Sequence, residues 1–244
     1  MSRHRGRRLA AVFSHPDDET FATGATIARY AHAGAEIALF CATDGAAGKS
    51  SAIPVGSPEE LASIRRNELH AAARHLGVRD VTACGHPDKG LSAMDAEALI
   101  GDIVRFLRRV QPEVVITFGP EGAPTGHADH RAISRAATAA FFLAALPTEY
   151  EGTGQPHRAA RLYYTTYRQP RPGARLQRLG LPPTARLDAR PWERRKREAF
   201  MLHATQRVHQ GTFEEIALTD EEWFTLASGT TQGDDVVDDL FENL

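Results

Sequence analysis

The sequence predicts an α/β fold of the Rossmann-like, doubly wound type, with a mostly parallel sheet and helices on both faces. Short apolar runs, expected as strands, alternate along the chain with longer segments in which apolar residues recur at helical spacing. The runs are continuously apolar, which is typical of parallel strands covered on both faces. Polar clusters rich in His and Asp follow two of the runs, and such sheets bind ligands at the carboxyl ends of their strands.

The first elements follow this alternation closely. The expected strand 9–14 (LAAVFS) runs directly into a polar motif, and the expected helix 22–33 ends at a glycine. The expected strand 36–43 (EIALFCAT) precedes a loop over 44–57 that is rich in Gly, Ser and Pro. The serine that ends this loop caps a helix extending to residue 76, because a proline and two glutamates occupy the first turn.

The middle of the chain continues the same order. Strand 80–84 precedes helix 95–110, which ends before a proline. Strand 114–118 (VVITF) precedes helix 128–145, and strand 162–167 is the fifth.

The C-terminal part is less regular. The segment 169–183 is rich in Pro, Arg and Gly and is expected as a loop. A helix over 191–206 and a short one over 219–227 are expected after it.

One domain is expected over residues 9–227. A chain of 244 residues is long enough to bury a substantial core without disulfides. Residues 1–8 carry four arginines and are expected as a disordered leader, and residues 228–244 as a solvated acidic tail.

Composition excludes several classes of function. The 29 basic and 31 acidic residues leave a net charge of −2, which argues against nucleic acid as a partner. Two cysteines are too few for a disulfide framework or a cysteine-based zinc site. No apolar run approaches the roughly 18 residues needed to span a bilayer, so no membrane partner is expected. Without a signal peptide pattern, the expected compartment is the cytoplasm.

The motif Ser-His-Pro-Asp-Asp-Glu over 14–19 directly follows the first strand. Three acids and a histidine repel one another in a core unless a positive charge lies among them. A turn in which Asp17 or Asp18 caps the next helix is one interpretation. The other is a metal site, in which His15 and Asp18 converge on a cation and Asp17 stays free as a base.

A second motif, Gly-His-Ala-Asp-His over 126–130, follows the fourth strand. His130 can supply a third ligand, His127 can face a substrate, and Asp129 can orient His127 and favour its charged form. Two histidines and a carboxylate with an open position for water suit catalytic zinc. They also suit non-haem Fe²⁺, so the ligand types leave the metal open.

This combination predicts metal-assisted amide hydrolysis. The metal lowers the pKa of a bound water toward about 7 and polarises a carbonyl. Asp17 can take the proton of that water, while His127 stabilises the oxyanion or protonates the leaving amine.

The two motifs together resemble those of the LmbE-like (PIG-L superfamily) zinc-dependent N-acetylglucosaminyl deacetylases. The resemblance extends to Arg-x-x-Glu at 65–68 before Leu-Gly at 76–77, to Gly-His-Pro-Asp at 85–88, and to Lys196, Ala199, His203, Thr205 and Gln206. Thr125 departs from the family, because some members carry a tyrosine near that position; Tyr163, Tyr164 or Tyr167 can fill its role.

The resemblance implies zinc as the cofactor and a role for each matching residue. His15, Asp18 and His130 would be the metal ligands, Asp17 the general base, His127 the electrophilic or acid residue, and Asp129 its support. Arg65 and Asp88 would bind sugar hydroxyls. From the residues alone, Arg65 is equally a solvated helix position and Asp88 a turn residue, while His203 and Gln206 face either the core or the pocket.

The expected function is removal of acetate from an N-acetylglucosaminyl group of a small sugar conjugate, of the mycothiol or bacillithiol precursor type. An amidase for a larger N-acyl or thiol conjugate, an Fe²⁺ oxygenase and a non-enzymatic sugar-binding module are the alternatives. The resemblance also implies a homo-oligomer, either a trimer or a hexamer. The loop over 44–50 lacks the first glycine of a phosphate-binding loop, so we expect a mobile lid there rather than a nucleotide site.

Overall fold

A seven-stranded mixed sheet forms the centre of the computed structural model, which describes residues 3–50, 53–167, 181–231 and 236–244. The strand order is β3-β2-β1-β4-β5-β7-β6. The first five strands are parallel, and β7 pairs antiparallel with both β5 and β6. The strands are β1 (Arg8–Phe13), β2 (Glu36–Thr43), β3 (Asp80–His86), β4 (Val114–Phe118), β5 (Arg161–Thr166), β6 (Ala185–Asp188) and β7 (Glu221–Ser228).

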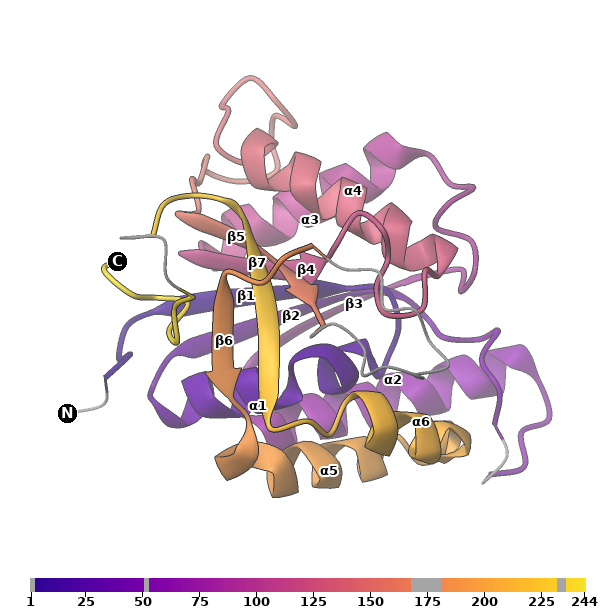
Figure 1. Ribbon diagram of the computed structural model, residues 1–244. Helices are drawn as coiled ribbons and strands as arrows, with labels where there is room; N and C mark the ends of the chain where they lie inside the picture. Colours follow the sequence, from indigo (N-terminus) through magenta and orange to yellow (C-terminus); the bar gives the residue numbers. More distant parts are fainter. Residues whose placement is uncertain (1–2, 51–52, 168–180, 232–235) are drawn as a thin grey trace.

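Helices cover both faces of this sheet, as Figure 1 shows, with α3 and α4 on one side and α1, α2 and α5 on the other. Local signals fix several helix ends: the Ser57 side chain accepts the N–H of Glu60, and Gly77 ends α2 at φ 97°. The helices are α1 (Asp18–His32), α2 (Pro58–Leu76), α3 (Ala96–Val110), α4 (Ala128–Leu143), α5 (Glu193–Leu202) and α6 (Gln210–Ile216).

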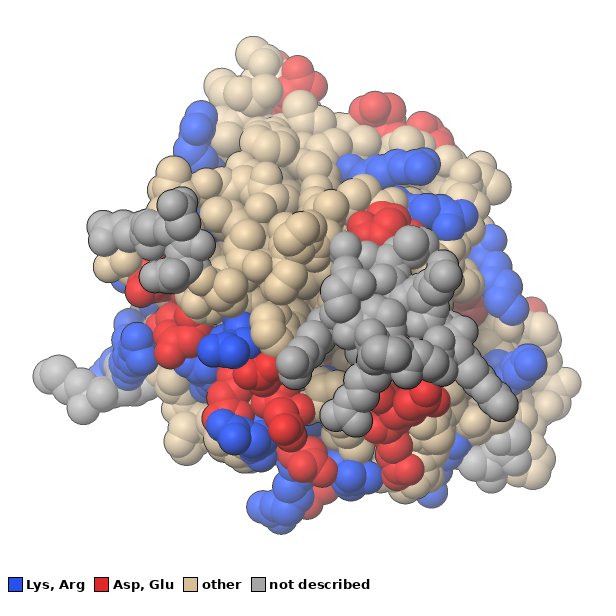
Figure 2. All heavy atoms as spheres, in the orientation of Figure 1, with Lys and Arg blue, Asp and Glu red and all other residues tan. Residues whose placement is uncertain are grey.

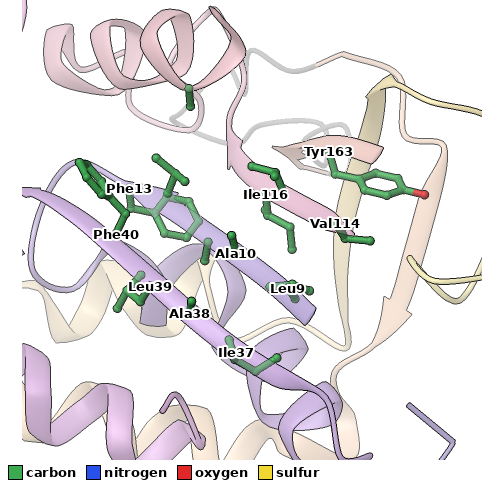
Figure 3. Close-up of a cluster of buried hydrophobic side chains, with 14 of the residues drawn as sticks. Leu9, Ala10, Phe13, Ile37, Ala38, Leu39, Phe40, Val114, Ile116 and Tyr163 are labelled. Atoms are coloured by element: carbon green, nitrogen blue, oxygen red, sulfur yellow. The ribbon is translucent and has the colours of Figure 1, made fainter. Parts of the chain in front are cut away.

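The core lies along the central strands. Side chains of β1, β2 and β4 interleave between the two helical layers, as Figure 3 shows for Phe13, Phe40 and Ile116. Every residue of β4 and all but the first of β1 and β2 are buried. The prediction of a Rossmann-like, mostly parallel sheet is therefore confirmed.

The edge of the sheet beyond β5 differs from the prediction. Residues 219–227 were expected as a short helix, but β7 occupies Glu221–Ser228 between β5 and β6. This segment forms a strand because β5 and β6 supply backbone hydrogen bonds on both sides of it. These contacts are tertiary, so the local sequence pattern does not predict them. The expected helix over 191–206 is divided into α5 and a 3-10 helix, η2 (Ala204–His209), and most of the expected loop 169–183 lies outside the described residues.

Both chain ends pack on the domain where they are described, which corrects the expectation of a disordered leader and a solvated tail. The imidazole of His4 is buried and lies 3.2 Å from the carboxylate of Asp239, which is 2% exposed. The same carboxylate accepts a hydrogen bond from the hydroxyl of Tyr30. Leu240 and Phe241 are buried in the core cluster. The tail is mostly acidic, and its apolar residues form a run too short to predict a helix or a strand.

Charges of both signs are mixed on the surface. In Figure 2 basic and acidic residues alternate over the lower part of the visible face, near α5, while the area to the left of and at the centre of the upper half is largely uncharged. No helix among the described residues combines the length and apolar character that a membrane crossing requires.

Candidate metal and catalytic centre

The sheet order brings the two sequence motifs together. β1 and β4 are neighbours, and the chain leaves β1 toward β2 but leaves β4 toward β5, so the loops that follow them diverge, and we call the region between these loops the crevice. The hydroxyl of Ser14 donates to the backbone carbonyl of Asp129 at 3.1 Å and joins the loops directly. This is the place where doubly wound sheets bind ligands.

His15 lies at the centre of the resulting cluster. Its Nε2 is 3.2 Å from both Asp88 Oδ1 and Asp129 Oδ2, and its Nδ1 is 3.4 Å from Asp18 Oδ2. Burial lowers the pKa of this imidazole, but the carboxylates outweigh burial and hold the pKa well above its usual value. Carboxylates on both ring nitrogens create a site that favours positive charge.

Asp18 joins the two motifs through imidazoles. Its Oδ2 accepts the backbone N–H of His15 at 2.7 Å, and its Oδ1 lies 3.3 Å from His130 Nε2. Burial alone would raise the pKa of Asp18, but the adjacent His130 and His15 lower it far below the usual value. The three expected ligands, His15, Asp18 and His130, are thus brought together, with Asp18 between the histidines.

His127 caps α4, and the structure corrects how it is held. Its Nδ1 accepts the backbone N–H of Asp129 at 3.1 Å, so its orientation comes from the backbone of Asp129. The carboxylate of Asp129 instead accepts from His15 and from the N–H of Leu91. Asp129 raises the pKa of His127, as expected, but burial, followed by the nearby His15 and His130, outweighs it and lowers the pKa below its usual value. A neutral ring with Nδ1 as acceptor carries its proton on Nε2 and is a hydrogen-bond donor.

Asp17 is held in an unusual backbone conformation, with φ 130°. Few residues other than glycine adopt this region, so the surroundings must enforce it. Burial raises the pKa of its carboxyl to about 6, against the lowering effect of Arg65, whose Nη2 lies 3.5 Å from Asp17 Oδ2. A carboxylate with this pKa is suited to accept a proton near neutral pH.

A buried network behind Asp17 enforces that conformation. Glu19 Oε2 accepts the backbone N–H of Asp17 at 3.1 Å, and Glu19 Oε1 lies 2.8 Å from His203 Nε2. The hydroxyl of Thr20 donates to the same Oε1 at 2.6 Å. His203 is fully buried, which resolves the earlier choice between core and pocket in favour of the core. The sequence does not predict the contact between Glu19 and His203, because 184 residues separate the pair and no local pattern connects them.

Arg65 and Asp88, the expected sugar-binding residues, both border this cluster. Arg65 is 3% exposed and donates to the backbone carbonyls of Gly45 and Pro16. Asp88 accepts the backbone N–H of Ala47 at 3.1 Å besides contacting His15. These contacts exclude a solvated helix position for Arg65; sugar binding by either residue stays a prediction.

The loop after β2 closes over Arg65. A Cβ at Gly45, which has φ 71°, would lie 2.7 Å from the guanidinium, so only glycine allows this approach. Lys89 and Gln206 donate to the carbonyls of Ala47 and Lys49 and hold the loop from outside. The loop also lines an open hollow of about 620 Å³.

Two tyrosines that we considered for oxyanion stabilisation lie elsewhere. Tyr163 is buried in the core, and the hydroxyl of Tyr164 is 2.8 Å from that of Thr138 on α4. Both side chains pack within the domain on β5, so the structure does not bring them into the cluster.

The donor set fits a divalent cation. His15, His127 and His130 form one group whose ligand atoms lie within 4.8 Å of one another, and His15, Asp88 and Asp129 form another. The carboxylates of this crevice outnumber its permanent cation, Arg65, and imidazole nitrogens are interleaved with them. A bound cation would offset the repulsion among these acids.

Comparison with known proteins agrees with this arrangement. Residues 10–141 match the family model PIG-L, described as GlcNAc-PI de-N-acetylase. The 1D-myo-inositol 2-acetamido-2-deoxy-alpha-D-glucopyranoside deacetylase of Rhodococcus jostii is 32% identical, over 96% of this chain and 97% of that protein.

Solved structures share the fold at lower identity. The N,N'-diacetylchitobiose deacetylase of Pyrococcus horikoshii aligns with a TM-score of 0.74 at 22% identity, covering 90% of this chain and 83% of that one. The 4-carboxy-2-hydroxymuconate hydratase of Pseudomonas putida aligns at 0.72 and 18%, covering 93% and 98%. The fold therefore hosts more than one reaction. The family model matches more than half of the chain, and the Rhodococcus relative matches nearly all of it, so the chain belongs to the PIG-L family.

Proposed function

We propose that the chain is a zinc-dependent deacetylase, which hydrolyses the N-acetyl group of an N-acetylglucosaminyl conjugate to acetate and a free amine. The observation that carries the proposal is the placement of Asp17, a half-buried carboxylate with a pKa of about 6, beside the His15, Asp18 and His130 cluster. A sugar-binding module has no need of a base held in a strained backbone conformation.

His15, Asp18 and His130 would hold the metal, because they supply imidazole and carboxylate donors from both loops of the crevice. When bound, zinc supplies Lewis acidity to the amide carbonyl and to the attacking water. Fe²⁺ is a second metal that accepts the same donors.

The protein groups then handle the protons. Asp17 accepts a proton from water as the oxygen–carbon bond forms at the amide carbon. The neutral His127 donates a hydrogen bond from Nε2 to the developing oxyanion. The protonated Asp17 returns its proton to the amide nitrogen as the carbon–nitrogen bond breaks, so acetic acid and the amine are released, and the acid proton passes to the amine to give acetate and an ammonium group.

For the substrate we infer a small glucosaminide with a polar aglycone. Relatives from Rhodococcus jostii and Streptomyces avermitilis, each 32% identical over nearly the whole chain, are named for an inositol-linked N-acetylglucosaminide. Arg65 and Asp88, at the rim of the metal cluster, would bind its hydroxyl groups.

Acetate release from a panel of N-acetylglucosaminides, with metal content quantified in the same sample, tests the proposal. We expect release to follow bound zinc and to stop after chelation. Bound metal with no acetate from this panel, but with amine released from a larger N-acyl conjugate, would favour the amidase. Sugar binding without turnover of either class would favour the binding module.

A further inference from the structure

A second group of ligand-type side chains lies at the outer edge of the sheet, apart from the catalytic crevice. Cys84 and His86 belong to β3, the edge strand, and Asp102 belongs to α3. One ligand atom from each lies within 4.8 Å of the others, and His86 Nε2 is 3.0 Å from Asp102 Oδ2. None of these residues contributes to the cluster around His15.

The backbone explains why the three side chains meet. The pairing of β3 with β2 is irregular here, because Ala83 pairs with Cys41 but His86 pairs with Thr43, which leaves an extra residue on β3 beside Cys84. Gly85, between Cys84 and His86, has φ 75° and faces the Arg66 guanidinium. Arg109, two turns along α3 from Asp102, donates to Asp80 and Thr82 and thereby fixes the helix against the strand.

We propose that Cys84, His86 and Asp102 form a binding site for a second divalent cation of the zinc type, a mixed site that needs one cysteine and so differs from the sites built on several cysteines that the composition excludes. A thiolate, an imidazole and a carboxylate are the three kinds of ligand that zinc accepts, and water can complete a tetrahedral set. The site goes beyond the proposed deacetylase activity and does not depend on it.

Hydrogen bonding accounts for only part of this cluster. Arg105 Nη1 donates to Asp102 Oδ1 at 2.8 Å, so the carboxylate of Asp102 contacts both Arg105 and His86. Among the described residues no hydrogen bond of the Cys84 thiol is found, and this side chain lies between the hydrophobic core and the polar pair of His86 and Asp102. The Arg105 side chain is 60% exposed and free to move away when a cation takes its place.

Binding exchanges a proton for the metal. Burial, and then the charge of Asp102, raises the pKa of Cys84 to about 12, while Arg105 opposes the shift. The free thiol therefore keeps its proton near neutral pH, and the sulfur–hydrogen bond breaks, with its proton going to solvent, only as the sulfur–metal bond forms. Affinity should weaken as the pH falls, because protons compete with the metal for the thiolate.

Cobalt(II) is the sharpest probe, because a thiolate ligand adds a sulfur-to-cobalt charge-transfer absorption that nitrogen and oxygen ligands lack. Chelator-treated full-length protein is titrated with Co²⁺ after circular dichroism confirms that it is folded. We expect the absorption in the wild type and its loss in Cys84→Ser. Cys41→Ser is the matched control: Cys41 is buried on β2, so this variant should keep the absorption.

His15→Ala separates this proposal from the first one. It should lose acetate release and the catalytic metal but keep the thiolate absorption. Asp102→Asn should raise the Co²⁺ concentration needed for half-saturation, and Zn²⁺ should slow alkylation of Cys84 in the wild type. Absence of the absorption in folded wild-type protein, or its persistence in Cys84→Ser, would overturn the site.

Discussion

Two buried charge clusters of this protein are built on different principles. Behind α1, Lys196 Nζ is 2.7 Å from Glu222 Oε1 and donates to the carbonyl of Ala217, and Glu222 accepts the N–H groups of Ala25 and Thr26. The charge of Lys196 is matched by that of Glu222, and backbone groups complete the hydrogen bonding of both side chains. Such a pair is complete without any ligand.

The crevice between β1 and β4 is not balanced in this way. Asp17, Asp18 and Asp88 gather near Arg65, and the imidazole of His15 lies against Asp18 and Asp88. The difference teaches how to distinguish the two kinds of cluster: a balanced pair supports the fold, and a surplus of carboxylates around imidazoles marks a place prepared for a cation and for proton transfer.

The largest expected effect separates chemistry from structure in the crevice. Asp17→Asn keeps the size of the side chain but cannot accept a proton, so kcat should fall by about 10²–10⁴-fold. Metal content and thermal midpoint, measured on the same sample, should stay near the wild-type values. Turnover close to wild type in a metal-loaded Asp17→Asn protein would remove Asp17 from its role as base.

The balanced cluster should respond in stability instead. Lys196→Met leaves Glu222 buried without its cation and should cost about 3–5 kcal/mol in the free energy of unfolding. Urea denaturation measures this loss. Adding Glu222→Gln removes the stranded charge while keeping an acceptor for the α1 amides, and should recover much of the stability; no recovery would show that the pair contributes through packing alone.

A smaller effect tests the network behind Asp17. His203→Gln weakens the support of Glu19, so kcat should fall roughly 10-fold or more, as with other outer partners of a site, while KM changes little. Thr205→Val is the matched control, because Thr205 bonds to Glu68 in the same buried segment without contacting Glu19. The control should lose stability but keep kcat; equal losses of kcat in both variants would assign His203 a purely structural part.

The smallest effect is a shift in pH dependence. Asp17 acts as a base only when ionised, and its folded pKa of about 6 lies above the ordinary value, so kcat/KM should rise as the pH increases through about 6. Arg65 lowers this pKa, and Arg65→Met should therefore move the rise to higher pH. Arg65→Lys keeps the charge and should move it less; an unmoved profile in Arg65→Met would assign the rise to another group.

Sequence reasoning reached the parts of this molecule that local pattern encodes. The continuous apolar runs predicted β1 to β5, and the placement of the two motifs after β1 and β4 predicted that His15, Asp18 and His130 would meet. Long-range pairing lay beyond that reach. The strand character of β7 depends on its neighbours β5 and β6, and the role of Glu19 depends on His203.

Side-chain direction was also beyond the sequence. The motif places Asp129 two residues after His127, yet the carboxylate of Asp129 contacts His15. Helix α4 begins between His127 and Asp129, and it is the backbone N–H of Asp129 that contacts His127. The packing of the chain ends is likewise not predictable from the sequence. It depends on the contacts of Asp239 with His4 and Tyr30, which lie far from it along the chain.

The adjacency of β1 and β4 also has a consequence for folding. His15 and Asp129 are 114 positions apart, so their contact requires closure of a long loop, which only the paired strands of the folded sheet sustain. A partly folded chain therefore lacks the crevice, and any ligand that bridges both loops binds the native state alone. At about 100 times its Kd such a ligand adds roughly 2.7 kcal/mol to the free energy of unfolding. Protection from heat or proteolysis by metal or substrate would thus report on assembly of the whole sheet.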